Sequence, residues 1–380
     1  MAHPSIRDDP TPVVLPERRS KMTNRRILAR RAVVAIVTLL LLPSLSACGE
    51  ASETEPEQTT ETLDIKSLEA AARDEGNLTW YTSSYTKTDA EGLAKDFENR
   101  YGIKVEVFRS QNGPVAQRFG TEEKAKHNVA DVITISQESA YQGFKEDGFL
   151  ARYTPLNVKN LLPEFQENES DGYYYPVTVG DMVILYNTDK LGPDEAPESW
   201  ASLLDERWNG EIAAASPLSS GYAVAWAARM ITDINPAYIK DLATQDVLVS
   251  QSTIDVLSSV ASGNRLIGVT AGAVVRQGAA KGDPISVVYP TDKAVYFTTP
   301  MAISRAAPHP NAARLFENYL YTDAAQELYS TYGLLALTEG APPPAGGKTP
   351  PISEMARVTL QDLVENTEKV TTQWRKGFGA

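Results

Sequence analysis

Two short stretches rich in hydroxyl and amide side chains follow β-strands predicted early in the chain. They are TSSYT at 82–86 and SQES at 136–139. Such side chains can hold a small polar solute by hydrogen bonds, and they can equally cap helices or complete turns. Two of these stretches at the same edge of one sheet favour a ligand site over two sets of caps. From them we select five candidate ligand residues: Ser83, Ser84, Tyr85, Ser136 and Gln137.

A second group of candidates lies in the middle of the chain. A loop at 216–221 separates a predicted strand from a helix that is predicted to begin at Tyr222. The first turn of a helix has free backbone N–H groups and the positive end of the helix dipole, so it can bind an anion. Further on, the apolar run at 265–270 predicts a buried strand, and the next helix carries an arginine that could pair with an anion or lie in solvent. These segments add five candidates: Ser219, Ser220, Gly221, Thr270 and Arg276.

The elements that must position these side chains alternate between strand and helix. Apolar and polar residues alternate at 103–108, and short apolar runs at 78–81 and 132–135 predict two more strands. Helices are predicted between them from a capping-box pattern at 88–91 and from the i, i+4 spacing of Val115 and Phe119. This β-α-β-α-β order indicates an α/β fold with a mainly parallel sheet. Ligands of such sheets bind beyond the carboxyl ends of the strands, where both serine-rich stretches fall.

The N-terminal segment has the pattern of a secretory signal peptide. Four arginines precede an apolar run at 32–42, which is too short to span a bilayer, and small residues then lead into Cys48. Residues 45–48, LSAC, resemble the bacterial lipobox, in which the cysteine is lipidated and becomes the first residue of the mature protein. We therefore predict a signal peptide at 1–47, with translation starting at Met1 or Met22, and a lipid on Cys48. The lipid would anchor the protein on the extracytoplasmic face of the cell membrane.

The composition of the remaining chain limits its partners. Residues 48–64, which include ASETEPEQTTET, predict a disordered tether behind the lipid. Residues 1–47 hold eight basic and three acidic side chains, so the remaining chain has 28 basic and 46 acidic ones and a formal charge of −18. This charge disfavours nucleic acid as a partner. Because Cys48 is the sole cysteine, packing without disulfides must stabilise the fold.

Five segments, in their order and spacing, carry a likeness to a known family. In these segments the chain resembles the extracellular solute-binding proteins of bacterial ABC importers, and in particular the branch that includes the ferric-ion-binding proteins. The likeness extends from about residue 78 to residue 337. The segments are LTWYTSS at 78–84, ADVITIS at 130–136, YPVTVGDMVILYNTDKL at 175–191, PESWASLLDERWNGEIA at 197–213 and PNAARLFENYLYTDAAQELY at 310–329.

The resemblance implies a two-lobed, periplasmic-binding-protein-like fold of type II, each lobe a mixed, mainly parallel sheet flanked by helices. Two crossovers, near 175–179 and 286–289, would join the lobes and act as hinges when the lobes close on a ligand. The expected division is lobe 1 at 65–177 with a return at 289–340, lobe 2 at 178–288, and a Pro-rich linker with a C-terminal helix at 341–380. The sequence leaves open which lobe this last helix contacts.

The resemblance also raises the question of a ferric site. In the ferric branch two adjacent tyrosines bind the metal just after the strand that matches LIGVT, and here Gly272 and Ala273 stand at those positions. Fe³⁺ needs several anionic oxygen ligands, which neither residue offers. The tyrosines open to an alternative ferric site are Tyr85 and Tyr174. His127 and His309 lie in segments far from the predicted cleft loops, so we expect no imidazole metal site and no bound cofactor.

We therefore expect a monomeric solute-binding lipoprotein that captures a small polar, anionic solute between two closing lobes and delivers it to the permease of an ABC transporter. The alternative is ferric iron, or an iron chelate, bound through tyrosines other than the usual pair. An enzyme is disfavoured, because residues 48–380 contain no G-x-S-x-G elbow and no phosphate-cradling G-x-x-x-x-G-K-[ST] motif. Acid or base chemistry by carboxylates stays open.

Overall fold

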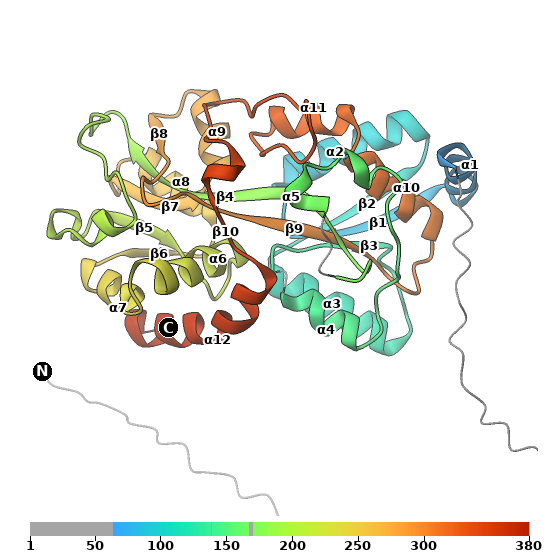
Figure 1. The fold of residues 1–380 in the computed structure, drawn as a ribbon, viewed down its shortest axis with the longest axis horizontal. Coiled ribbons are helices and arrows are strands. Elements are labelled where there is room, and N and C mark those ends of the chain that lie inside the picture. Colours follow the sequence, from blue (N-terminus) through green and yellow to red (C-terminus); the bar gives the residue numbers. More distant parts are fainter. Residues whose placement is uncertain (1–63, 138, 167–169, 380) are drawn as a thin grey trace, which may run out of the picture. The chain divides into compact units, whose positions relative to one another are not determined.

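The computed structural model describes residues 64–137, 139–166 and 170–379 of the chain. The predicted signal peptide, Cys48 and the predicted tether up to residue 63 lie outside the described residues. The described part has an α/β fold in which one mixed sheet runs through two lobes (Figure 1). Among the helices of this described part, none combines the length and the apolar character that a membrane crossing requires.

Ten strands of the described part form the sheet, in the order β2-β1-β3-β9-β4-β7-β5-β6, with β10 paired to β9 and β8 paired to β4. We call the part built on the parallel strands β1, β2 and β3 lobe 1, and the part built on the parallel strands β5, β6 and β7 lobe 2. Strands β4 and β9 run antiparallel to each other and to their neighbours β3, β7 and β8. The strands are β1 Asn77–Thr82, β2 Lys104–Arg109, β3 Val132–Thr134, β4 Tyr175–Asn187, β5 Ile212–Ala215, β6 Leu248–Ser250, β7 Ile267–Ala271, β8 Ile285–Val288, β9 Val295–Ile303 and β10 Ala356–Arg357.

Helices cover both faces of the sheet, because its central strands are apolar on both sides. In β4, Met182 and Ile184 face one apolar cluster, whereas Val183 and Leu185 face another. In lobe 2 the first cluster includes α6, α7 and α12 and the second includes α8 and α9; in lobe 1, α1, α2, α10 and α11 contribute to one cluster and α3 and α4 to the other (Figure 1). The helices are α1 Ile65–Glu75, α2 Lys87–Tyr101, α3 Asn112–Ala125, α4 Ser139–Glu146, α5 Pro163–Gln166, α6 Gly221–Arg229, α7 Tyr238–Leu242, α8 Thr253–Ala261, α9 Gly272–Lys281, α10 Pro310–Leu320, α11 Asp323–Thr331 and α12 Leu360–Phe378.

Strands β4 and β9 are the two passages between the lobes. The first part of β4 pairs with β9, and its second part pairs with β7 and β8 of lobe 2. The crossover expected at 175–179 therefore lies within β4. The crossover expected at 286–289 is wrong, because these residues belong to β8 and to the turn that follows it. Lys293 has a positive φ of 78° and donates its N–H to Pro290 O in that turn, so the chain reverses before β9 crosses to lobe 1.

Several helices begin directly at the edge of the sheet. The capping box expected at 88–91 is not used, because Thr86 is the N-cap of α2 and accepts a hydrogen bond of 3.2 Å from the N–H of Asp89. Ser220 and Ser252 cap α6 and α8 in the same way. Each cap follows the carboxyl end of a strand within a few residues, so α2 begins at the carboxyl ends of the lobe 1 strands, and α6 and α8 begin at the carboxyl ends of the lobe 2 strands. The strands of the two lobes run in opposite directions through the sheet.

The C-terminal segment contacts both lobes. Ser330, at the end of α11, donates from Oγ to Pro343 O at 2.6 Å, and its carbonyl accepts from Ala345 N at 2.8 Å. β10 then pairs with β9, and α12 packs against α6 and α7 through Val370 and Trp374. Leu360, the first residue of α12, packs against the α3 and α4 cluster of lobe 1. The helix that the sequence left unassigned thus packs mainly on lobe 2.

Candidate functional site

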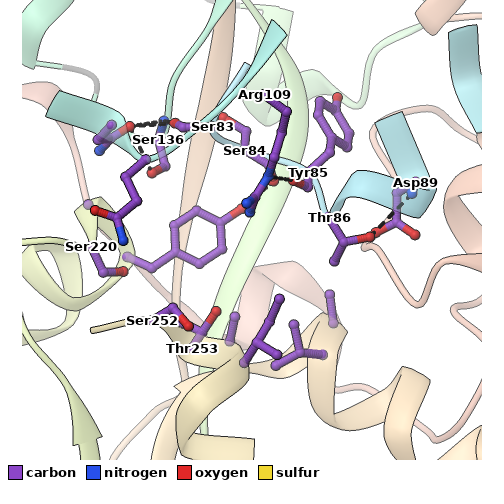
Figure 2. Close-up of a pocket in the computed structure, with 18 of the residues that line it drawn as sticks. Ser83, Ser84, Tyr85, Thr86, Asp89, Arg109, Ser136, Ser220, Ser252 and Thr253 are labelled. Atoms are coloured by element: carbon purple, nitrogen blue, oxygen red, sulfur yellow. Dashed lines mark hydrogen bonds between the residues drawn. The ribbon is translucent and has the colours of Figure 1, made fainter. Parts of the chain in front are cut away.

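A pocket of about 110 Å³ lies between lobe 1 and lobe 2, at the carboxyl ends of the parallel strands. Figure 2 shows Ser83, Ser84 and Arg109 on one side of it and Ser220, Ser252 and Thr253 on the other. The structure brings seven of the ten candidate residues into its wall. These are Ser83, Ser84, Tyr85, Ser136, Ser219, Ser220 and Gly221.

Asn112 organises the lobe 1 wall. Its Oδ1 accepts a hydrogen bond from Ser83 Oγ at 2.5 Å and another from Ser136 N at 3.2 Å, so it ties the two serine-rich stretches together. Ser84 Oγ is buried and has no hydrogen-bond partner among the described residues. A buried hydroxyl without a partner is costly, so the loop after β1 carries an unsatisfied polar group beside the pocket. Sequence reasoning missed Asn112, which lies in the first turn of α3 rather than in a serine-rich stretch.

The lobe 2 wall consists of two loops that lead into helices. Ser220 Oγ accepts from Ala223 N at 3.4 Å, and Ser252 Oγ accepts from Asp255 N at 3.2 Å. Ser219 Oγ donates to Gln251 O at 2.7 Å, which joins the two loops. Ser220 and Ser252 are therefore the N-caps of α6 and α8. Capping occupies the acceptor side of Ser220 and leaves its hydroxyl proton for a solute.

The N-termini of five helices converge on the pocket. Their N-cap residues, which all line it, are Thr86 of α2, Gln111 of α3, Ser220 of α6, Ser252 of α8 and Ala271 of α9. The side chains of Gln111 and Ala271 make no capping hydrogen bond, so the first amides of α3 and α9 lack that usual acceptor. Aligned helix dipoles place partial positive charge at each of these ends. The pocket is therefore electrically suited to a negative group although the chain as a whole is acidic.

Arg109 is the one cationic side chain among the described residues that line the pocket. It is the last residue of β2, and its Nε donates to Tyr85 O at 3.1 Å, which fixes the guanidinium near the loop after β1. The sequence could have predicted Arg109 as a site residue. It ends a predicted strand, and the carboxyl end of that strand must lie at the same edge of the sheet as the carboxyl end of β1. Asp89 contributes a carboxylate to the opposite end of the wall, where Gln277 Nε2 donates to it at 3.1 Å.

Arg276 does not face the pocket, which corrects the expectation for this candidate. Its guanidinium is buried, donates to both carboxylate oxygens of Asp181 at 2.8 Å, and donates from Nε to Gly333 O at 2.7 Å. A Cβ on Gly272 would overlap the Asp181 carboxylate. The glycine at this position therefore makes room for a buried ion pair that joins β4, α9 and the turn after α11.

Two other candidates also lie outside the pocket wall. Thr270 is buried behind it, where its Oγ1 donates to Thr253 O at 2.8 Å and supports the start of α8. Gln137 is half-buried, and its backbone carbonyl accepts from Ala140 N in the turn that begins α4. Thr270 thus supports α8, whose first residues line the pocket, whereas Gln137 supports α4, none of whose described residues lines it.

The two tyrosines considered for a ferric site, Tyr85 and Tyr174, are buried in two different apolar clusters. Tyr85 OH lies 2.9 Å from Tyr329 OH in the core, and burial raises the pKa of Tyr85 well above its ordinary value. Tyr174 belongs to the apolar cluster of α3 and α4, with its ring 5.1 Å from that of Tyr141. Burial also raises the pKa of Tyr222, in the pocket wall, to about 12. The phenols of Tyr85 and Tyr222 are therefore protonated at neutral pH in the metal-free chain. The described residues contain no cluster of three His, Cys, Asp or Glu able to hold a metal.

Residues 127–362 match the family of bacterial extracellular solute-binding proteins, and the chain belongs to this family. A curated relative, "Iron uptake protein A1" of a Synechocystis species, is 26% identical over 189 residues, which are 49% of this chain and 48% of that protein. The matched region thus spans about half the length of the curated relative.

Solved structures share the fold of the described part. The periplasmic binding protein AfuA from Actinobacillus pleuropneumoniae, with fructose 6-phosphate bound, has a TM-score of 0.69 and 22% identity, covering 80% of this chain and 99% of that chain. Iron-bound HitA from Pseudomonas aeruginosa has a TM-score of 0.68 and 19% identity, covering 79% and 99%. These are periplasmic binding proteins of type II, and at such identity the likeness concerns the fold alone. The two neighbours hold different ligands, so the ligand must be argued from this chain's own residues.

Proposed function

We propose that this protein is the solute receptor of an ABC importer and that its solute is a small organic or inorganic oxyanion, such as a phosphate ester. The pocket between the lobes would capture the solute, and the closed protein, acting as a monomer, would present it to the permease. A lipid on Cys48 would hold the protein at the extracytoplasmic face of the membrane. Membership of the solute-binding family supports the receptor role, and the pocket supports the chemical class of the solute.

The observation that carries the proposal is the convergence of five helix N-termini and Arg109 on one pocket. One N-terminus stabilises a nearby anion by typically about 0.3 to 1 kcal/mol, and a hydrogen bond to a charged group adds about 1.5 to 3 kcal/mol. The distributed negative charge of the chain opposes binding only weakly, because physiological salt screens charges beyond about 8 Å. The hydrogen-bond donors of the pocket therefore decide the sign of the charge on the solute.

Ferric iron is the second candidate, because iron-binding proteins are among the relatives and structural neighbours. The composition of the wall argues against it, since Fe³⁺ needs several anionic oxygen ligands and Asp89 is the one lining carboxylate among the described residues. The hydroxyls of the lining tyrosines, Tyr85 and Tyr222, are engaged by Tyr329 OH and by Ser84 O. An enzyme is also disfavoured. The described lining residues include no histidine, cysteine or glutamate to act as acid, base or nucleophile.

A thermal-shift panel of inorganic phosphate, fructose 6-phosphate, citrate, glucose and ferric citrate tests the class of solute. We expect stabilisation by an oxyanion, with about 2.7 kcal/mol at 100 times the dissociation constant. Arg109→Gln should weaken that binding about 10- to 150-fold in titration calorimetry, because one charge-assisted interaction is lost. Lys104→Gln, at the exposed start of the same strand, is the matched control and should leave affinity unchanged. Stabilisation by ferric citrate alone, with a visible tyrosinate band, would support the ferric alternative instead.

A further inference from the structure

Lobe 2 touches the backbone of lobe 1 at the first residue of α6. A Cβ placed on Gly221 would lie 2.7 Å from Asn112 Nδ2 and 2.9 Å from both C and O of Ser136. Real Cβ atoms essentially never approach other heavy atoms this closely, and the Ser136 contact is with backbone, which cannot rotate away. The two lobes therefore meet at Gly221 with no space for one methyl group.

The local backbone does not require glycine at this position. Gly221 is not among the described glycines with positive φ, so an L-residue can adopt its conformation. It is also the first residue of a helix, where alanine is acceptable and an interior glycine is unfavourable. The need for glycine at residue 221 thus comes from the facing lobe and not from α6 itself.

Two further contacts between the lobes lie beside the pocket. Tyr222 packs its ring against Phe297 of β9 and donates its hydroxyl to Ser84 O of lobe 1 at 3.4 Å. On the α9 side, Gln277 Nε2 donates to Asp89 Oδ2 at 3.1 Å and to Tyr332 O at 2.7 Å. The buried pair of Arg276 and Asp181 lies next to Gln277, close to the crossing strands. The two lobes therefore touch at two places: Gly221 of α6 meets Asn112 and Ser136, and Gln277 of α9 meets Asp89 and Tyr332.

We infer that Gly221 sets the closest approach of the two lobes and thereby permits the closed, solute-enclosing state. The inference rests on the proposed function, since enclosure of a solute is what the contact serves. A methyl group at residue 221 would hold the lobes apart at the α6 side while leaving each lobe's own core untouched. Ser220 of lobe 2 would then be too far from Ser83 and Ser136 of lobe 1 to contact the same solute as they do.

The approach of the lobes can be measured without any solute. In the chain carrying Cys48→Ser, cysteines are introduced at Gln111, next to Asn112, and at the exposed Leu218, three residues before Gly221. No other thiol is then present, and bismaleimides of graded length report how closely and how often the two positions approach. We expect Gly221→Ala to slow cross-linking by the shortest effective reagent about tenfold, a penalty in the range that overpacking by one methyl group imposes.

The matched control is Gly113→Ala, which adds the same methyl group to the first turn of α3 on the facing lobe. A Cβ on Gly113 meets no atom within 4 Å. The rate of cross-linking should therefore stay within about twofold of the reference, which is the Cys48→Ser chain with the two introduced cysteines and Gly221 unchanged. Circular dichroism and thermal unfolding of both variants show whether each remains folded.

Equal cross-linking rates in folded Gly221→Ala and the reference would overturn the inference, and so would a reference that no reagent cross-links. Repeating the measurement with fructose 6-phosphate and inorganic phosphate addresses the proposed function separately. If neither probe speeds cross-linking of the reference, those two anions fail as solutes, and the comparison of Gly221→Ala with Gly113→Ala still stands on its own.

Discussion

Glu317 of α10 is a carboxyl group in the core of lobe 1, with 2% of its surface exposed. Burial raises the pKa of Glu317 well above its ordinary value, and neighbouring Tyr321 and Tyr153 offer no cation. In the unfolded chain the group ionises near pH 4.3, whereas in the folded chain it stays protonated to higher pH. Above about pH 4.3 the unfolded state therefore binds fewer protons than the folded state. Glu317 then makes the free energy of unfolding fall as pH rises, by up to about 1.4 kcal/mol per pH unit.

Glu317→Gln removes this titration and keeps the shape of the side chain. We expect the free energy of unfolding in urea to be higher for the variant than for the wild type at pH 7.5, with a difference that shrinks as pH falls toward 4.5. Glu327→Gln, on the exposed face of α11, is the control and should show no such pH dependence. A Glu317→Gln variant that is equally stable or less stable than the wild type at every pH would contradict this.

The environment of a residue, rather than its type, explains which site candidates failed. Arg109 is the last residue of β2 and Arg276 lies in α9, the helix after β7, and the local sequence does not tell the buried side chain from the exposed one. The partner of Arg276 is Asp181, 95 residues earlier in β4, so only the folded chain brings the pair together. The candidate serines lie in the pocket wall because strand ends and helix starts are local features, which a sequence pattern records.

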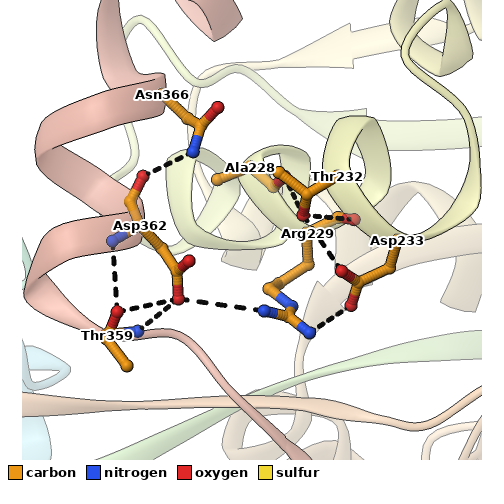
Figure 3. A network of polar contacts seen from close by, with 7 residues as sticks. All are labelled: Ala228, Arg229, Thr232, Asp233, Thr359, Asp362 and Asn366. Carbon is orange, nitrogen blue, oxygen red and sulfur yellow. Dashed lines mark hydrogen bonds and ion pairs between the residues drawn. The ribbon is translucent and has the colours of Figure 1, made fainter.

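Helix α12 is held to lobe 2 by an apolar face and by a polar network at its start. Thr359 and Asp362 form a capping box, and Arg229 of α6 lies 3.8 Å from Asp362 and also pairs with Asp233 (Figure 3). At the other end, Trp374 is completely buried among residues of α6 and α7, and its ring lies 4.1 Å from that of Phe378. The helix is thus an integral part of the lobe 2 core.

Trp374→Ala should lower the free energy of unfolding by about 3 to 5 kcal/mol, because it removes a large buried ring and leaves a cavity. Val364→Ala on the same helix is the control, since that side chain is 54% exposed and should cost less than about 1 kcal/mol. Urea unfolding monitored by far-UV circular dichroism measures both. A Trp374→Ala protein with unchanged stability would mean that α12 is a dispensable appendage of lobe 2.

At the scale of elements, the sequence predicts the regular parts well and the junctions poorly. The strands at 78–81, 103–108 and 132–135 appear as β1, β2 and β3, because alternation and short apolar runs are set by burial of their own residues. The second crossover is misplaced, since β8 and β9 are both apolar and only pairing with β4 distinguishes them. The start of α2 shifts to Thr86 for a related reason: two nearby threonines can both cap, and the loop geometry selects one.

For the whole molecule, the two-lobed architecture could be predicted only from the resemblance to a known family. The spacing of apolar residues within one segment does not specify that two lobes share a sheet. The pocket follows from that architecture, since both lobes direct the carboxyl ends of their parallel strands toward each other. The acidic net charge of the chain is compatible with a pocket wall rich in helix N-terminal amides and holding Arg109, because the charge is distributed over the whole chain and the wall is one cleft. Composition alone would have assigned the protein a preference for cations.

The predicted position of the molecule at the membrane depends on Cys48, which lies outside the described residues. Stable anchoring by acyl chains takes more than one chain, and a diacylated cysteine supplies two. We expect Cys48→Ser to move the protein from the membrane fraction to the soluble fraction outside the cytoplasm when fractions are compared by immunoblot. Ser52→Ala in the predicted tether is the control and should leave the protein in the membrane fraction. A Cys48→Ser protein that is cleaved to the mature length and still sediments with membranes would refute the lipid anchor and imply that a surface of the folded part binds the membrane or a membrane protein directly.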